Sequence, residues 1–198
     1  MSCGGSGTAA RRSLQTHDAR PFAVEFELLG GPAAGTTLEL DYREFAYAGK
    51  FVMSDTGKAV ARTAGETVGA VAFNRDHSDA AVVRLRYVTV REDRRGQGVG
   101  ARLLRFTADR LSAKYDAVVI AVNNPVAYRA CYRAGFQSTG TERGIAELEL
   151  RYEPGGERDR SRYEEGLAVF ATRDLPADQR DCLERSRRTG PPPVVAVP

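Results

Sequence analysis

A glycine-rich loop stands between a predicted strand and a predicted helix, and this succession constrains the fold more than any other feature. The strand is the β-branched run Ala80–Val90, and the loop is Arg95–Ala101. The helix is predicted by small and apolar residues at three- and four-residue spacings, at Gly100, Leu103, Leu104, Thr107, Ala108, Leu111 and Tyr115. A wholly apolar run, Ala117–Val122, then predicts a strand covered on both faces, and Asn124-Pro125 opens a second helix to about Ala134. This alternation of strand and helix predicts an α/β (α+β) fold.

The residue types of the loop favour an anion as its ligand. Glycines at alternate positions, Gly96, Gly98 and Gly100, remove the Cβ atoms that would keep an anion away from the main chain. The start of the following helix directs free N–H groups and the positive end of its dipole at the same space. Arg94 and Arg95 add positive charge beside it. The loop and the helix start together predict a pyrophosphate site.

Two other interpretations of the loop fit the sequence less well. A dinucleotide-binding fingerprint, GxGxxG/A, fits Gly96, Gly98 and Ala101, but it expects an acidic residue about 20 positions later. Val122 and Asn123 stand at that later place, which disfavours a dinucleotide. A turn without any ligand does not explain why three glycines cluster with two arginines.

Two motifs in this order resemble those of the GNAT family of acyl-CoA-dependent N-acyltransferases. The family signature Q/R-x-x-G-x-G/A is met by Arg95, Gly98 and Gly100. The later family motif, N-x-x-A followed by a tyrosine and then Gly-Phe, is similar to a stretch that contains Asn124, Ala127, Gly135 and Phe136. The resemblance covers about Val68–Tyr152, and the two motifs together are far more specific than a lone GxG.

The resemblance implies a mixed, mostly antiparallel sheet that splays between its two central strands, is flanked by helices and holds acetyl-CoA in the gap. In such proteins the strand before the loop pairs its backbone with the acyl carbonyl and the pantetheine arm, which maps to Val88 and Val90. Asn124 corresponds to a residue beside the cofactor arm. The pyrophosphate lies on the loop amides, which maps to Arg95, Gly96, Gln97, Gly98, Val99, Gly100 and Ala101.

The predicted catalytic acid depends on one helical position. The usual acid of the family is a tyrosine four residues before the Gly-Phe pair, where this chain has Cys131, with Tyr132 one step later. One helical step turns the side chain by about 100°, so the two cannot face the gap in the same way. Either a local bulge lets Tyr132 act, or Cys131 takes the position, or both residues only pack. Among these alternatives we favour Tyr132.

The sequence does not identify a general base. The strand before the loop carries Arg84 and Arg86, where many relatives have a glutamate. Glu66 and Glu92 are substitutes by residue type, although each also fits a solvated charge. The segment Leu40–Phe51 has room for one short helix at most, whereas the family has two helices between its first strands. Because the family builds its acceptor site largely from that region, the acceptor-binding residues of the family cannot be mapped onto this sequence.

Patterning divides the chain into three parts. Residues 1–20 have no periodicity and predict a flexible tail, residues 21–152 predict a GNAT-like acyltransferase domain, and residues 153–198 predict an accessory, partly disordered tail. A short helix is predicted near Ala177–Arg187. Further strands are predicted at Phe22–Leu29, Thr36–Tyr42, Val68–Asn74, Phe136–Glu142, Ile145–Tyr152 and Gly166–Thr172.

Composition excludes several classes of protein. The 198 residues contain no apolar run of the ~18–20 residues that a membrane-spanning helix needs, and the first twenty lack the apolar stretch of a signal peptide. The three cysteines lie far apart, and His17 and His77 have no partner at ligand spacing, so we predict no disulfide framework and no metal site. A reducing, cytoplasmic setting is the simplest expectation.

The charge distribution favours phosphate more than nucleic acid. The net charge is only +3, but nine basic and three acidic residues lie between Arg84 and Lys114. Such a segment attracts phosphate, whether in a nucleotide or in a nucleic-acid backbone. Because the few aromatic residues do not interleave with the arginines, no stacking platform for nucleic acid is predicted.

The loop and the resemblance together predict an N-acetyltransferase that moves an acetyl group from acetyl-CoA to a primary amine by direct attack. The acceptor is a small-molecule or peptide amine that the sequence does not name. The displaced tyrosine and the missing base leave a non-catalytic acyl-CoA-binding regulatory module as the alternative. An exposed closing strand would allow two chains to pair as a homodimer.

Overall fold

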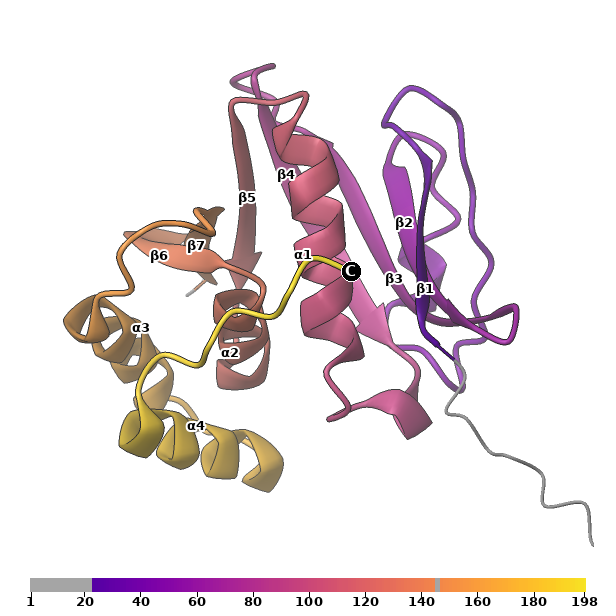
Figure 1. Ribbon diagram of the computed structural model, residues 1–198. Coiled ribbons are helices and arrows are strands. Elements are labelled where there is room, and N and C mark those ends of the chain that lie inside the picture. The colour runs from indigo at the N-terminus through magenta and orange to yellow at the C-terminus, as the bar shows by residue number, and fades with distance from the viewer. Residues whose placement is uncertain (1–22, 145–146) are drawn as a thin grey trace, which may run out of the picture.

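Seven strands form one mixed sheet in the order β1-β2-β3-β4-β5-β7-β6 (Figure 1). The computed structural model describes residues 23–144 and 147–198. All neighbouring strands are antiparallel except β4 and β5, which run parallel. The predicted mixed, mostly antiparallel sheet is confirmed. Its strands are β1 (Glu25–Gly30), β2 (Gly57–Thr63), β3 (Glu66–Arg75), β4 (Val82–Val90), β5 (Ala117–Val122), β6 (Phe136–Arg143) and β7 (Glu147–Tyr152).

Helices α1 (Val99–Ser112) and α2 (Pro125–Arg133) pack on the sheet through one shared apolar cluster. In this cluster Leu103 and Leu111 of α1 are buried together with Val71 and Leu85 of the central strands. Figure 1 shows α1 lying along the sheet in front of β4. Full burial of each such side chain stabilises the fold by about 1.5–3 kcal/mol, so the stripe fixes α1 on the strand that precedes the loop.

An irregular segment, residues 31–56, covers the opposite face of the first strands. Phe51 is fully buried there against Val60 and Ala72, and Leu38 and Leu40 pack on the same cluster. The segment contains the short 3₁₀ helix η1 (Ala48–Lys50), in agreement with the room for one short helix at most.

The predicted strand at Thr36–Tyr42 is wrong, because these residues join no strand of the described sheet. The Leu38 amide donates to the Phe51 carbonyl at 3.0 Å, and the leucine side chains lie on the sheet face. Their apolar alternation therefore reflects packing onto the sheet and not pairing within it. The strand that lies between β1 and β3 in the sheet is instead β2, for which the sequence predicted no strand.

Strand β2 was missed because a lysine interrupts its apolar pattern. Lys58 is fully buried, and its ammonium donates to the carbonyls of Met53 at 2.7 Å, Thr56 at 2.8 Å and Thr36 at 3.1 Å. A buried charge is tolerated when it is fully hydrogen-bonded. Burial lowers the pKa of Lys58, and the nearby Asp55 carboxylate opposes that shift.

The predicted strand at Gly166–Thr172 is also wrong, because these residues belong almost entirely to helix α3 (Arg160–Ala171). The Asp159 carboxylate caps this helix by accepting from the Ser161 amide at 2.8 Å. The fully buried side chains recur at helical spacing, at Tyr163, Leu167 and Phe170. The apolar run Gly166–Thr172 is too short to show a helical period, and Tyr163, which makes the period visible, lies before the run.

Helix α4 (Ala177–Thr189) confirms the helix predicted near Ala177–Arg187. Helices α3 and α4 pack on each other, α4 packs on α2 and α3 packs on β6, at the side of the molecule away from β1 (Figure 1). Residues 153–198 are therefore docked on the sheet domain through α2 and β6.

Two sequence expectations concern other parts of the chain. The predicted tail at residues 1–20 lies outside the described residues. Within the described ranges, no helix combines the length and the apolar character that crossing a membrane requires.

Candidate cofactor site

The two parallel strands separate toward their carboxyl ends. Strand β4 pairs with β5 only from Val82–Ala117 to Leu85–Ile120, whereas it stays paired with β3 as far as Val90. The β3–β4 register shifts between Leu85 and Tyr87, which marks a bulge where the separation begins. Bulges bend a strand and increase its twist. Figure 1 shows β4 and β5 diverging beyond this point.

The backbone of β4 beyond the bulge presents hydrogen-bonding groups to this gap. The Arg91 amide donates to the Val68 carbonyl of β3 at 2.9 Å. Because antiparallel pairs alternate between bonded and non-bonded positions, Val88 and Val90 then direct their N–H and C=O groups away from β3. The Val90 carbonyl accepts a 3.3 Å bond from Arg95 Nε, which agrees with this direction. The two valines named from the sequence therefore point their backbone groups into the splayed gap.

The glycine-rich loop closes the same end of the gap. Gly96 has φ 75° and Gly98 has φ 81°, a left-handed conformation that favours glycine at both positions. Gly98 is the N-cap of α1, and no described side chain caps this helix. The first intrahelical bond runs from the Arg102 amide to the Gly98 carbonyl at 3.2 Å, so the preceding amides of the turn have no intrahelical acceptor. These amides and the helix dipole form an anion cradle.

An arginine holds the entry to the loop in place. Arg91 donates to the Asp93 carboxylate at 2.8 Å and to the Glu66 carboxylate at 3.0 Å. These bonds raise the pKa of Arg91, and the same contact lowers the pKa of Asp93. Gln97 Nε2 donates to the Asp93 carbonyl at 2.9 Å, which closes the turn. Glu66, one of the substitutes for a general base, is thus an ion-pair partner of Arg91.

Arg133 is a site residue that the sequence analysis did not name. A Cβ atom built on Gly98 would lie 3.5 Å from a guanidinium nitrogen of Arg133, so helix α2 brings this cation to the loop. Among the described residues, no hydrogen bond or ion pair is made by that guanidinium. The signal available in the sequence was its place two residues before the Gly135-Phe136 pair.

Asn124 has a structural use at the start of α2. Its Oδ1 accepts from the Ala127 amide at 2.8 Å, and its Nδ2 donates to Asn123 Oδ1 at 3.0 Å. The side chain therefore caps α2, which fixes this helix beside the gap.

Cys131 and Tyr132 are both almost fully buried, at 1% exposure each. Burial raises the pKa of the Cys131 thiol. The Tyr132 hydroxyl accepts from the Ser138 amide at 3.1 Å and lies 3.3 Å from the Tyr128 hydroxyl, which in turn lies 3.3 Å from the Tyr163 carbonyl. The Tyr128 hydroxyl is within donating distance of both the Tyr132 hydroxyl and the Tyr163 carbonyl, and its single proton serves one of the two. The Tyr132 hydroxyl is therefore engaged within the protein by the Ser138 amide and the Tyr128 hydroxyl.

The arginine that stands in place of a glutamate belongs to a buried ion-pair network. Arg84 donates to Asp76 at 2.8 Å and to Glu149 at 2.9 Å, and Arg143 also pairs with Glu149. A hydrogen bond from the Ser78 amide and then Arg84 lower the pKa of Asp76 to about 2. Carboxylates engaged in this way are weak proton acceptors at neutral pH.

The described residues contain no group of three or more His, Cys, Asp or Glu side chains that could hold a metal ion. His77 is exposed at the far end of the sheet from the glycine-rich loop.

Comparisons with known proteins agree with this geometry. Residues 54–138 match the family model of the acetyltransferase (GNAT) domain, and no curated protein matches the sequence. A GNAT family acetyltransferase from Elizabethkingia anophelis with acetyl-CoA bound has a TM-score of 0.51 at 16% identity, covering 66% of this chain and 97% of its own. A Bacillus subtilis acetyltransferase in complex with CoA also has a TM-score of 0.51, at 13% identity, covering 66% of this chain and 99% of its own.

Both similarities cover about two thirds of this chain, and about a third of it lies beyond them. The matched residues include β4, the glycine-rich loop, α1, β5 and α2. Residues 54–138 thus match the acetyltransferase (GNAT) domain model, and the sheet is similar in fold to a solved acetyltransferase of the GNAT family.

Proposed function

We propose that this protein is an N-acetyltransferase that moves the acetyl group of acetyl-CoA to a primary amine of a small molecule or peptide by direct attack. One observation carries the proposal. At one end of the sheet, the glycine-rich loop, whose amides no described side chain caps, meets the edge of β4 that has no paired strand beyond Leu85 among the described residues. The two solved structures with similar folds were described with acetyl-CoA and with CoA bound. The two free cysteines of the described residues, Cys131 and Cys182, fit the cytoplasmic setting that forms part of the proposal.

The residues present fit the proposed cosubstrate. A side chain at position 98 would fill the space between the loop and Arg133, and glycine leaves this space open for a pyrophosphate. The uncapped amides at the start of α1 and the Arg133 guanidinium both complement negative charge. Val88 and Val90 offer the backbone donors and acceptors that an amide-bearing arm such as pantetheine would pair with.

The chemistry that acetyl-CoA supplies is a thioester, whose carbonyl carbon a neutral amine attacks while the bond to sulfur breaks. Negative charge then grows on the acyl oxygen, and the Val88 N–H in the gap is suited to stabilise it. Donors of this kind are worth about 10²–10³-fold in kcat. The amine loses a proton to water, and the leaving thiolate takes up a proton. Tyr132 and Cys131 stay the two predicted sources of that second proton.

The regulatory alternative, a module that binds acyl-CoA without turnover, has one observation in its favour. The Tyr132 hydroxyl and the carboxylates near the gap already have partners within the protein. Turnover of acetyl-CoA with any amine would exclude this alternative.

Titration calorimetry with acetyl-CoA, beside NADH as a control, tests the proposal. We expect micromolar binding of acetyl-CoA and none of NADH, because the loop lacks the acidic partner that a dinucleotide site requires. A screen of amines with detection of the released thiol then measures turnover. Absence of acetyl-CoA binding would contradict the proposed function, and binding without turnover on any amine would favour the regulatory module.

The variant Tyr132→Phe separates an acid from a packing residue. Because the hydroxyl satisfies the buried Ser138 amide, we expect the free energy of unfolding to fall by about 1–3 kcal/mol. We expect kcat to fall by less than about tenfold, since the hydroxyl is buried and already engaged by Ser138 and Tyr128. Thermal unfolding and initial rates on the same preparation measure both quantities.

Cys131→Ala is the matched variant at the neighbouring position. A fall in kcat of about 10²-fold or more in only one variant, at little cost in stability, would name that residue as the acid. Small and equal losses in both would reject both candidates and leave the proton to solvent.

A further inference from the structure

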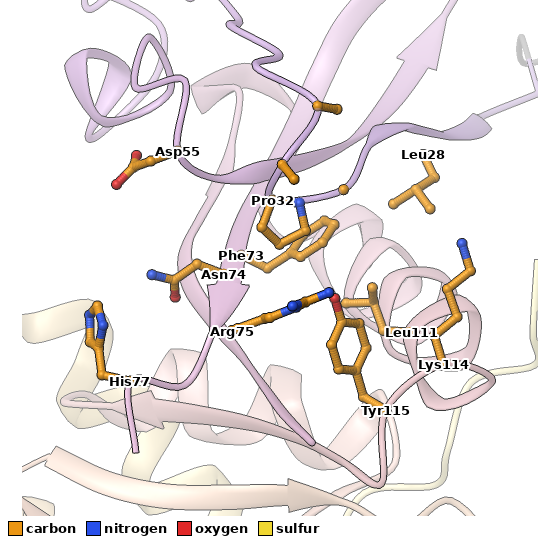
Figure 2. A pocket seen from close by; sticks show the side chains of 13 residues that line it. Leu28, Pro32, Asp55, Phe73, Asn74, Arg75, His77, Leu111, Lys114 and Tyr115 are labelled. Carbon is orange, nitrogen blue, oxygen red and sulfur yellow. The ribbon is translucent and has the colours of Figure 1, made fainter. Parts of the chain in front are cut away.

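A cavity lies at the opposite end of α1 from the glycine-rich loop. Its volume is about 610 Å³, within the range of sites for small molecules. It is bounded by the turn after β1, the carboxyl end of β3 and the residues that end and follow α1 (Figure 2). Leu111 and Tyr115 mark its α1 side, whereas the cofactor loop begins before Val99, at the other end of the helix.

The interior of this cavity is apolar. Phe73 and Leu111 are buried at its base, and Leu28, Pro32 and the ring of Tyr115 form its sides. Figure 2 shows Pro32 and Leu28 on one side and Tyr115 on the other, with Phe73 between them. Such a space takes up the hydrocarbon or aromatic part of a ligand, because burial of apolar surface is favourable.

The rim carries two cations that no described residue neutralises. Arg75 at the end of β3 and Lys114 just after α1 are both exposed, and neither has an ion pair or hydrogen bond from its side chain. In Figure 2 the Arg75 side chain extends toward Tyr115, beside which Lys114 also lies. The cations therefore flank the apolar wall from two different elements.

The carboxylate of the lining does not cancel this charge. Asp55 lies with Asn74 and His77 on the other side of the cavity (Figure 2). Its field acts on the buried Lys58 ammonium, whose pKa it raises against the effect of burial. Asp55 and Lys58 thus offset each other, and the positive charge of Arg75 and Lys114 is left for a ligand.

We propose that this cavity is a second ligand site, which binds a small carboxylic acid with an apolar or aromatic body. The body lies against Phe73, Leu111 and Tyr115, and the carboxylate faces Arg75 and Lys114. Arg75 and Lys114 favour ligands that carry a carboxylate. The apolar base of the cavity disfavours acids that lack a hydrocarbon part. The site goes beyond the proposed acetyl transfer and does not depend on it.

Calorimetry with 4-phenylbutyrate and its neutral analogue 4-phenylbutanol tests the site in the full-length protein. We expect 4-phenylbutyrate to bind at least about tenfold more tightly than the alcohol, both with and without saturating acetyl-CoA. Arg75→Gln and Lys114→Gln should each weaken the acid by about two- to fivefold and leave the alcohol unchanged. Arg188→Gln, an exposed arginine of α4 away from the cavity, is the matched control and should change neither.

The variant Ala33→Trp fills the cavity from an exposed loop position and keeps both cations, so it should abolish binding of both compounds. Equal affinity for acid and alcohol would overturn the proposal in favour of a simple apolar crevice. Competition of 4-phenylbutyrate with acetyl-CoA, together with indifference to the Arg75 and Lys114 variants, would assign the acid to the cofactor gap. Absence of binding at millimolar concentration would overturn the site while leaving the acetyl-CoA titration unaffected.

Discussion

Replacing Gly98 by tryptophan is expected to abolish measurable binding of acetyl-CoA while the protein stays folded. Gly98 is the N-cap of α1 at φ 81°, and a side chain there extends into the space beside the Arg133 guanidinium. A ligand phosphate would lose at least two charge-assisted hydrogen bonds of about 1.5–3 kcal/mol each. The dissociation constant should rise by about 10²–10⁴-fold, as measured by calorimetry.

The control for this variant must reproduce the backbone strain without touching the loop. Gly140 has φ 76°, and a Cβ atom built on it meets nothing within 4 Å. Gly98→Trp and Gly140→Trp both place a side chain in the left-handed region, at a cost of about 1–2 kcal/mol. Gly140→Trp should therefore lower the Tm similarly and keep wild-type affinity. Affinity of Gly98→Trp within threefold of wild type would show that the loop is not the phosphate cradle.

The geometry of the loop could be predicted because it depends on the local sequence. The glycines, the adjoining helix start and the two valines all lie within one continuous stretch, and the periodicity of the flanking elements fixes their geometry. Val88 and Val90 share a strand edge by alternation alone, so their common direction follows from the sequence once the strand is accepted. The bulge in β4 between Leu85 and Tyr87 could not be predicted, because nothing in the sequence of the strand marks its position.

The features that could not be predicted depend on contacts between distant segments. Arg133 reaches Gly98 only because α2 packs beside α1, and Lys58 is buried only because two loops supply its acceptors. The contacts of the Tyr132 hydroxyl with Ser138 and Tyr128 likewise do not follow from its residue type. In each case the side-chain contact follows from how the chain folds and not from the hydrophobic pattern of the segment.

The second large effect is expected from Gly166→Val in α3. A Cβ atom built on Gly166 lies 2.6 Å from Cζ of Tyr128 and closer still to its hydroxyl oxygen, so any side chain displaces that ring. Tyr128 is fully buried and stacks on Tyr163 at 5.4 Å between ring centroids, which leaves it no free space. Overpacking here should cost about 3 kcal/mol, a fall in Tm of roughly 6–12 °C for a chain of this size.

Ala168→Val is the control, because Ala168 is exposed on the same helix and the change carries only the helix-propensity cost of below about 1 kcal/mol.

The form of the unfolding curve then shows whether residues 153–198 unfold together with the sheet domain. Since Tyr128 lies on α2, whose last residue Arg133 faces the loop, displacing the ring should lower the affinity for acetyl-CoA as well as the Tm. If Gly166→Val instead only loosened α3 and α4 to proteolysis and left the main transition and the affinity unchanged, the C-terminal helices would be a separable addition. A single cooperative transition at lower temperature is the expected result, because the tyrosine cluster joins α2, α3 and β6 through the same buried hydroxyls.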